Sequence, residues 1–489
     1  MKLFSVRFRR TSLILVGCTT FLLGIGLARY DHLNVSIIWI ILLACYTGIA
    51  WRRKNILTLL FVVATCLLFG LWRGNQFAIE TQAYQHLYEH NVTIIGEVKS
   101  DSIYGKNGQL SFELGKVELV KPYRDSMVGV VNVSGYGENA IYRGDIVSVQ
   151  GKLKSTLGSK QGRISYAEVN LLNSNPSLVQ KLRSKFTAGI YSAIPDPEAS
   201  FGLGLLIGQR DTLPKETSDI LKIVGLTHII AVSGYNLTIL VRAAQRAFGK
   251  RSKYQATLAA FLLITSFLAV TGLSASIVRA AIVSTLGLLA WYFGRLIRPT
   301  LLIALSAAIT AGWYPIYPWS DIGWYLSFLA FFGVLVLAPL VTQRIWGPDK
   351  KHSTMNLVII ESFCAQIMTI PIILFIFHQS SLVGLVANIL VVPLVPLAMV
   401  LGLFAGIAGV FVPILAGYVA WPATILLTYM LDVARVLSRV PNAQVKLNVD
   451  LFTMLFLYAT LLFICWVLYL KVKGKYGTIK QNYFDEMTG

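Results

Sequence analysis

The sequence predicts a polytopic α-helical membrane protein with a small β-barrel domain inserted outside the cytoplasm. Three observations support this fold class. The chain of 489 residues is 55% hydrophobic and 13% charged, whereas soluble globular chains carry about 25% charged residues. Several nearly charge-free runs approach the roughly 20 residues that a helix needs to cross a bilayer. One stretch between these runs changes to short β-rich segments separated by glycines.

The membrane helices are expected at the apolar windows. The clearest windows are residues 11–27, 35–51, 56–72, 255–270, 276–293 and 452–470. One such run could be a signal peptide, but this many indicate a bundle that spans the membrane several times. The first three windows predict an N-terminal helical domain over residues 1–75.

Basic residues predict how the chain is oriented. They cluster at the N-terminus, after the second window and after the last window, as Lys2, Arg7, Arg9, Arg10, Arg52, Arg53, Lys54, Lys471, Lys473 and Lys475. We expect a multi-pass protein of the cell (inner, cytoplasmic) membrane. Because Lys and Arg collect in cytoplasmic loops, these three clusters should lie on the cytoplasmic side. Both termini are then cytoplasmic, and residues 476–489 form a cytoplasmic tail. The formal charge of +20 reflects either this rule or a polyanionic substrate.

Residues 90–179 predict the extracytoplasmic β domain. Six β-rich runs are separated by turn residues, at positions 92–98, 110–114, 117–120, 127–133, 146–153 and 164–172. Strands of this number and spacing, with Gly144 and Asp145 leading into the fifth run, suit a small closed barrel of OB type. Other small barrels would give much the same pattern.

An OB-like barrel can bind nucleic acid through a basic groove and stacked aromatic rings. The candidate basic contacts are Lys99, Lys106, Arg143, Lys152, Lys154, Lys160 and Arg163, and the candidate aromatic residues are Tyr104, Phe112, Tyr123, Tyr136, Tyr142 and Tyr166. From residue 91 to 179, however, ten Lys/Arg face eight Asp/Glu. This small excess of basic residues is not typical of a strong DNA-binding domain. The aromatic side chains are then more simply explained as core or turn residues.

An amphipathic helix and a second membrane domain are predicted after the barrel. Residues 180–200 place Lys181, Arg183 and Lys185 among apolar residues, which is typical of a helix at the membrane surface. Pro195 and Pro197 end this helix. Residues 201–475 are then expected to form the membrane channel domain.

Polar residues occur at four places inside this membrane domain. They are His228, Ser233, Gly234 and Asn236, then Arg279, then Asp321, then Gln366 and Asn388. A charged side chain at bilayer depth costs about 2.5 to 3.5 kcal/mol on insertion scales, so such residues usually face a bundle interior or a water-filled path. Each also has a structural explanation. His228 can be a packing residue, Arg279 can reach the interface, and Asp321 can cap the following helix.

The fourth polar place lies in a stretch that prolines interrupt. Asn388 stands between Gly384 and the prolines Pro393 and Pro396, and Pro371 follows Gln366. Irregular backbone at membrane depth is tolerated only inside protein or beside a water-filled cavity. A conduit explains this pattern economically.

Several catalytic and metal-binding patterns are absent from the sequence. It has no Gly-Lys-Ser or Gly-Lys-Thr of an ATP-binding loop, and His86 and His90 lack the glutamate order of a zinc protease. The five cysteines lie in apolar segments, which argues against a disulfide framework or a cysteine metal site. We therefore expect no enzyme activity, no metal and no cofactor.

Together the four polar segments resemble the ComEC family of competence channels. Residues 225–234 are similar to the family pattern Gly-Leu-x-His-x-x-Ala-x-Ser-Gly, and residues 272–280 to its small-residue and Arg-Ala segment. Residues 321–328 are similar to Asp-x-Gly-Phe-x-Leu-Ser-Phe, and Gln366, Pro371, Asn388 and Pro393 to its Gln and Asn-Pro segments. The resemblance runs from about residue 201 to residue 396.

The resemblance implies import of single-stranded transforming DNA into the cytoplasm during natural competence. Membrane lipids and DNA receptor proteins are the expected partners of such a channel. A separate cytoplasmic ATPase is expected because the sequence has no ATP-binding loop, and a separate nuclease because it has no cluster of metal ligands. Two features depart from the family. Tyr235 and Asn236 stand where Leu-His is common, and the metallo-β-lactamase-like domain of many members is expected to be missing.

A second hypothesis comes from another functional class. The chain could be a membrane-embedded transporter or an enzyme that acts on a small or lipid-linked substrate, with an OB-like domain that binds a sugar or protein partner. Inverted repeats would favour a transporter, and no obvious ones are found in the sequence.

Overall fold

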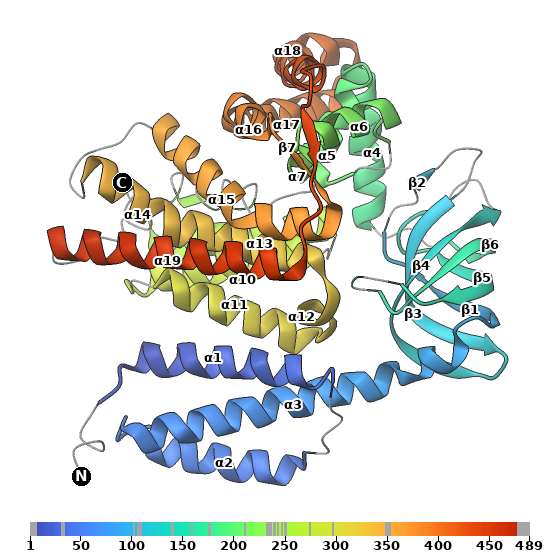
Figure 1. Cartoon of the computed structure of the whole chain (residues 1–489). Helices are drawn as coiled ribbons and strands as arrows, with labels where there is room; N and C mark the ends of the chain where they lie inside the picture. Colours follow the sequence, from blue (N-terminus) through green and yellow to red (C-terminus); the bar gives the residue numbers. More distant parts are fainter. Residues whose placement is uncertain are drawn as a thin grey trace. The chain divides into compact units, whose positions relative to one another are not determined.

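Three N-terminal helices lead into the barrel in the computed structural model. They are α1 (Arg10–Leu27), α2 (Ile37–Ala50) and α3 (Ile56–Leu87). The helices α1 and α3 touch where Gly24 faces Gly70, because a Cβ on Gly70 would lie 2.2 Å from the carbonyl oxygen of Phe21. Such small residues let membrane helices approach backbone to backbone. With 32 residues, α3 continues past the predicted window to the barrel (Figure 1).

Two units make up the chain. The first unit comprises Met1–Ser177 and Thr300–Tyr325, and the second comprises Leu178–Pro299 and Leu326–Gly489. The structure describes residues 7–30, 35–100, 103–104, 110–137, 141–156, 158, 160–174, 178–209, 212–230, 237, 241, 244–245, 248, 252–272, 275–295, 298–347 and 354–476.

The β domain of the first unit is a closed barrel. Its strands are β1 (Asn91–Val98), β2 (Ile103–Tyr104), β3 (Leu110–Lys121), β4 (Asp125–Gly137), β5 (Ile146–Lys154) and β6 (Gly162–Asn173). The strand order is β1-β5-β6-β4-β3, and β1 also pairs with β3, which closes the barrel. Only β4 and β6 run parallel among the described pairs. This five-stranded topology confirms the predicted small OB-like barrel.

Strand β3 differs from the prediction. The runs 110–114 and 117–120 were expected as separate strands, but they form one strand with a register shift between Gly115 and Val117. Lys116 sits at this shift with a φ of 48°. An extra residue of this kind is a β-bulge, which bends a strand without ending it. The short strand β2 was not predicted.

The barrel core combines strand residues with the end of α3. Inward-facing residues from all five main strands are buried together, among them Ile94, Phe112 and Val149. Tyr84 and Leu87 of α3 lie in the same cluster. The last turns of this helix therefore belong to the barrel core.

The segment after residue 299 packs on the N-terminal helices within the first unit. It contains α11 (Pro299–Trp313), α12 (Ile316–Ser320) and the start of α13 (Ile322–Phe332). Arg73 Nε of α3 donates to the Gly312 carbonyl at 3.0 Å. Trp319 Nε1 of α12 donates to the Ile25 carbonyl of α1 at 2.8 Å. These bonds connect segments that are far apart in the sequence.

Helices form most of the second unit. They are α4 (Leu178–Ala193), α5 (Glu198–Ile207), α6 (Lys215–Ile223), α7 (Thr227–Ile230), α9 (Lys253–Thr271), α10 (Ala275–Tyr292), the π-helical turn η3 (Gly333–Leu337), α14 (Ala338–Trp346), α15 (Thr354–Phe377), α16 (Gly384–Val391), the 3-10 turn η4 (Val392–Leu394), α17 (Val395–Phe411), α18 (Pro413–Ser438) and α19 (Leu451–Tyr476). The strands β7 (Gln379–Ser381) and β8 (Gln444–Lys446) pair antiparallel. The stretch that contains Asn388 is interrupted at η4, as the prolines predict.

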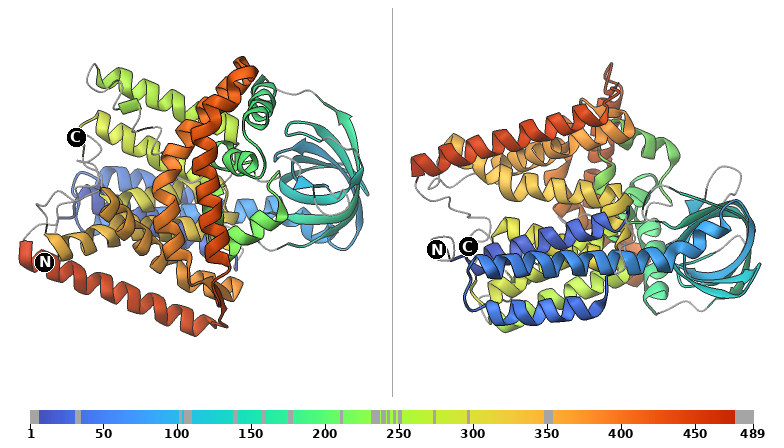
Figure 2. Two further views of the ribbon diagram at one scale, coloured as in Figure 1. Left: turned by 90° about the horizontal axis from the view of Figure 1, so that it is seen from above. Right: turned by 60° about the horizontal axis from the view of Figure 1, so that its bottom comes forward.

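The helices α4 and α17 approach at glycines. A Cβ on Gly409 would lie 2.0 Å from the Gly189 carbonyl oxygen, and one on Gly406 would lie 2.3 Å from a ring carbon of Phe186. The neighbouring α17 and α18 run side by side (Figure 2). The predicted amphipathic helix therefore exists as α4, with one face against α17. Its position at the membrane surface stays a prediction.

Eight helices in the described part of the chain are long and apolar enough to cross a membrane. They are Arg10–Leu27, Ile56–Leu87, Lys253–Thr271, Ile322–Trp346, Asn356–Phe377, Gly384–Phe411, Pro413–Ser438 and Leu451–Gly474. The prediction of a polytopic membrane protein is confirmed. At 14 residues, α2 is shorter than its predicted window.

Candidate functional site

Gln366, Ser381 and Gly384 lie together in the second unit. A Cβ on Gly384 would lie 3.2 Å from Gln366 Nε2 and 3.3 Å from Ser381 Cβ. Gly225, which has a φ of 74°, faces the same group, because its Cβ would lie 3.3 Å from Ser381 Cβ. A residue with a side chain would be strained at this φ and tightly placed. Two predicted motif segments therefore meet here, at what we call the Gly225–Gly384 contact.

His228 lies about one helical turn after Gly225. Its Nδ1 lies 3.0 Å from the Gly225 carbonyl oxygen, and its side chain is exposed. This contact closes the turn at the start of α7. The other predicted residues of this motif, Ser233, Gly234 and Asn236, lie outside the described residues.

Two amide oxygens near the Gly225–Gly384 contact have no hydrogen-bond partner among the described residues. They are Oε1 of Gln366 on α15 and Oδ1 of Asn388 on α16. Asn388 is 9% exposed and lies one helical turn after Gly384. An unpaired buried acceptor is costly, and such groups often mark a place that another molecule or water occupies.

Arg279 is buried in α10. Its side chain is 2% exposed, and the next two residues, Ala280 and Ala281, pack against Ala260 and Ile264 of α9. Arginine keeps its proton in any protein environment. Snorkelling to water, the alternative explanation for this residue, does not fit so low an exposure. The structure therefore buries a fixed positive charge in α10.

Asp321 belongs to the first unit and caps α13. Its Oδ1 accepts from the backbone N–H of Trp324 at 3.2 Å, which is the bond expected of an N-cap. Gly323 lies beneath it, since a Cβ there would be 3.1 Å from Asp321 Oδ1. The predicted structural role of Asp321 is thus observed.

Ion pairs separate the basic residues of the barrel into two groups. Lys99 contacts Glu97 at 3.3 Å, Lys152 contacts Glu89 at 2.8 Å and Lys160 contacts Glu113 at 2.6 Å. The hydrogen bond and charge of Lys152, with a smaller contribution from Lys154, lower the pKa of Glu89. Lys106 lies outside the described residues, and Arg143 lies in the turn before β5.

Lys154 and Arg163 form the second group. They are paired directly across β5 and β6, and neither makes an ion pair with a residue that the structure describes. Like charges that face each other across two strands are destabilising. Tyr166 follows on β6, 78% exposed and with a φ of 57°. Of the predicted aromatic contacts, Phe112 lies in the core instead, because its side chain is 2% exposed.

The model of the Competence protein family matches residues 205–472, which is more than half of the chain. The chain belongs to the Competence protein family. The match covers Arg279, Asp321, Gln366 and Asn388, and the resemblance noted from the motifs is therefore confirmed.

ComE operon protein 3 of Bacillus subtilis (strain 168) is a relative of this family member. The two chains are 26% identical over 231 residues, which cover 47% of this chain and 29% of the relative. The matched region thus spans less than a third of the relative's length. No solved structure matches the chain.

Sequence patterns missed two polar groups. Glu198 is buried at the start of α5, where its Oε1 accepts from Thr428 Oγ1 at 3.1 Å. Gln161 is buried in the connection before β6 and contacts Tyr314. Glu198 directly follows Pro197 in an apolar stretch, and this isolated acid was the available signal. No local pattern distinguishes Gln161 from an exposed loop residue.

Proposed function

We propose that this Competence family member forms the membrane conduit through which single-stranded DNA enters the cytoplasm. The observation that carries the proposal is the burial of Arg279 in α10, within the family-matched region. A guanidinium offers passing phosphates a fixed charge and up to two parallel hydrogen bonds. Charged side chains inside a membrane bundle usually face its interior or a water-filled path, which is where a polyanion would pass.

The polar groups at the Gly225–Gly384 contact support the same function. The unpaired amide oxygens of Gln366 and Asn388 can accept hydrogen bonds from bases or from water that accompanies a strand. The predicted lining also includes His228, Ser233, Gly234, Asn236 and Asp321. We propose that Arg279 and the polar residues of the second unit contact one path, and that Asp321 supports the channel domain as the cap of α13.

In this proposal, the single-stranded DNA makes its first contact with the barrel. Lys154 and Arg163 face each other and make no ion pair with a described residue, and a phosphate placed between them would remove their repulsion. Tyr166 is exposed enough to stack on a base. The paired residues Lys99, Lys152 and Lys160 are less available, because each already contacts a carboxylate.

The same proposal assigns the energy source and strand processing to other polypeptides. A separate cytoplasmic ATPase pulls the strand, receptor proteins deliver the duplex, and a separate nuclease removes the other strand. Membrane lipids surround the conduit. The absence of an ATP-binding loop motif from the sequence is the reason for assigning the energy source to another polypeptide.

The proposed conduit is tested by replacing Arg279. We expect Arg279→Ala to lower the uptake of labelled DNA into a nuclease-resistant form about 100-fold, or roughly 2.7 kcal/mol at 1.36 kcal/mol per factor of ten. Binding of DNA to the cell surface should be unchanged. Arg279→Lys keeps the charge without the planar group and should give an intermediate value.

Arg295→Ala is the matched control, because Arg295 is exposed just after α10. Membrane protein levels are compared by immunoblot. Uptake by Arg279→Ala that equals uptake by Arg295→Ala, at equal protein levels, would exclude Arg279 from the path and remove the main support for a conduit.

A further inference from the structure

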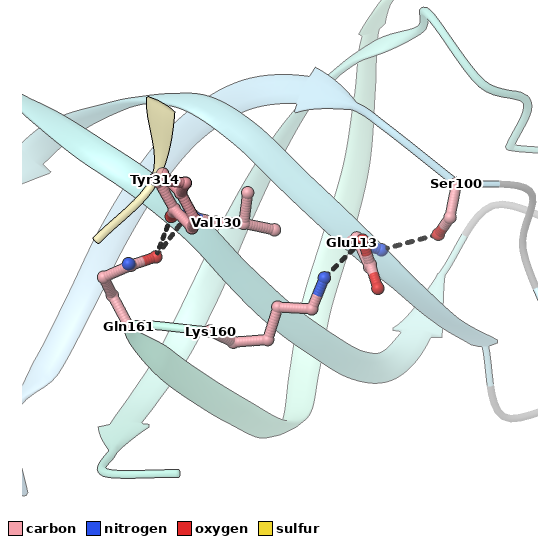
Figure 3. Close-up of polar contacts among 6 residues, drawn as sticks. All are labelled: Ser100, Glu113, Val130, Lys160, Gln161 and Tyr314. Atoms are coloured by element: carbon pink, nitrogen blue, oxygen red, sulfur yellow. Dashed lines mark hydrogen bonds and ion pairs between the residues drawn. The ribbon is translucent and has the colours of Figure 1, made fainter. Parts of the chain in front are cut away.

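Gln161 connects the barrel to the helical segment that ends at Asp321. Its Oε1 accepts from the Val130 backbone N–H at 2.6 Å and from the Tyr314 hydroxyl at 3.0 Å, as Figure 3 shows. Its own backbone N–H donates to the Val130 carbonyl, and its carbonyl accepts from the Tyr88 hydroxyl at 2.6 Å. At 5% exposure, this glutamine is buried. Four bonds therefore hold one residue of the β5–β6 connection.

The orientation of the Gln161 amide follows from its partners. A backbone N–H can only donate, so the group that faces Val130 must be the amide oxygen. The nitrogen Nε2 is consequently turned away, and it has no partner among the described residues. The side chain thus acts as a double acceptor and leaves its donors unused.

Gly129 makes room for this arrangement. It has a φ of 131°, and a Cβ at this position would lie 2.3 Å from Gln161 Oε1. Any other residue would be strained and would push the amide away from Tyr314. The backbone of β4 is therefore shaped around the Gln161 side chain.

A second bond links the same connection to the same helical segment. Ser320 Oγ donates to the Gly158 carbonyl at 2.6 Å. Nearby, Lys160 pairs with Glu113 of β3, whose backbone N–H donates to Ser100 Oγ at 2.9 Å (Figure 3). The β5–β6 connection is thus held by the barrel on one side and by residues 314–320 on the other.

The N-terminal helices hold the opposite side of this segment. The Phe77 ring of α3 contacts Tyr314 edge-on at 5.1 Å, and Trp319 donates to Ile25 of α1. Residues 314–320 lie directly before Asp321, whose backbone N–H donates to the Tyr317 carbonyl at 3.1 Å. Any shift of this segment would move the cap of α13.

We propose that Gln161 is a positioning residue for Asp321. Through Tyr314 it holds residues 314–320 in place, and in this way the barrel fixes the start of the family-motif helix α13. The inference rests on the proposed conduit, because it gives the barrel a second role beside contact with DNA. The role needs no movement: the link is a static support.

Two variants test the link. Tyr314→Phe removes the hydroxyl that donates to Gln161 and keeps the ring against Phe77. Gln161→Leu removes both acceptor contacts and keeps most of the side-chain volume. Tyr418→Phe and Gln150→Leu are matched controls, because Tyr418 is 83% exposed and Gln150 is exposed on β5.

The first measurement is hydrogen exchange of residues 314–321 in the purified full-length protein in lipid nanodiscs. We expect exchange in Tyr314→Phe to be about fivefold faster, which is the effect of one hydrogen bond of ordinary net strength. DNA uptake should fall in parallel by a similar factor. The double variant should be no worse than Gln161→Leu alone, because both changes remove the same contact.

Three results would overturn the inference. They are unchanged exchange in Tyr314→Phe, faster exchange with normal uptake, and additive losses in the double variant. If Gln161→Leu does not accumulate in the membrane, Tyr314→Phe alone decides. Failure of the conduit itself appears differently, as normal uptake in Arg279→Ala, and the exchange measurement would then still decide whether the link exists.

Discussion

Asp321 shows how one residue can serve as a helix cap inside a family motif. Its side chain accepts from Trp324 N–H, and Gly323 leaves space for the carboxylate. An N-cap needs an oxygen acceptor and does not need a charge, since asparagine caps helices about as well as aspartate. Capping and charge can therefore be separated by substitution.

We expect Asp321→Asn to keep at least about half of the normal DNA uptake, because the amide oxygen can still accept from Trp324. Asp321→Ala removes the cap, which costs about 1 kcal/mol, and uptake should fall about fivefold or more. Uptake is measured at matched membrane protein levels, with the exposed Asp432→Ala as control. Equal defects in the Asn and Ala variants would instead assign the role to the negative charge.

The unpaired residues of the barrel should contribute more to DNA binding than the paired ones. We expect Lys154→Gln with Arg163→Gln to weaken binding of single-stranded DNA. The slope of log K against log salt should fall by about 1.4, at roughly 0.7 per phosphate contact. Filter binding at several salt concentrations measures both quantities.

Lys99→Gln with Lys116→Gln is the matched control for this pair. It removes the same charge from residues that both contact Glu97. Partial burial raises the pKa of Glu97, but the hydrogen bonds and charges of these two lysines outweigh it, so that the pKa is lowered. Equal changes of slope in both double variants would show that only net charge matters and that no local site exists.

Residue types predicted part of the site. A charged residue in an apolar run was sufficient to select Arg279, and a polar residue before an aromatic helix was sufficient to propose the cap at Asp321. Gln161 could not be found in this way, because its role depends on Tyr314, which lies 153 positions away in the sequence. Local patterns do not contain such long-range contacts.

At the scale of elements, glycines decide which helices approach closely. Gly189 of α4 meets Gly406 and Gly409 of α17 at distances that no side chain would allow. This contact holds the helix after the barrel against the interrupted α16–α17 stretch. It is therefore a place where one added side chain should separate two elements.

We expect Gly409→Leu to destabilise the protein by about 1 to 3 kcal/mol or more, because added volume must push α4 away. Gly417→Leu is the control, since no atom lies within 4 Å of a Cβ built on that glycine. The temperature of inactivation in detergent and the amount of protein in the membrane provide the measurements. Equal stability of the two variants would mean that α4 is free to move from α17.

Elements were predicted well where periodicity and composition agreed. The apolar windows became α1, α3, α9, α10 and α19, although α2 is shorter than its window. The error at β3 has a physical cause: Gly115 and Lys116 resembled a turn, but in the barrel they form a bulge between two continuous ladders. Pairing with β1 and β4 kept the strand whole, and pairing partners are not visible in one strand's sequence.

At the scale of the whole molecule, orientation across the membrane remains a prediction from the basic residues. Tyr123 lies in the exposed turn between β3 and β4 and suits a topology test. Asn107, another position in the predicted outer domain, lies outside the described residues. With the barrel outside the cytoplasm, a cysteine at position 123 should be accessible from the medium.

We expect Tyr123→Cys to react with a membrane-impermeant thiol reagent in intact cells, and Arg295→Cys to react only after lysis. The five native cysteines, Cys18, Cys45, Cys66, Cys364 and Cys465, are replaced first to remove background labelling. Labelling is followed by a gel shift. The reverse pattern would place the barrel in the cytoplasm, and DNA could not meet it before crossing the membrane.

The unbroken helix α3 fixes the rotational angle of the barrel. Arg73 on this helix bonds to Gly312, and Tyr84 on the same helix lies in the barrel core. One residue inserted between them would turn the barrel by about 100° and advance it by about 1.5 Å. Gln161 would then face away from Tyr314, although neither residue had been changed. The number of residues from Arg73 to Tyr84 is thus constrained, independently of which residues they are. An alanine inserted in the exposed turn at Tyr123 would leave the angle of the barrel unchanged.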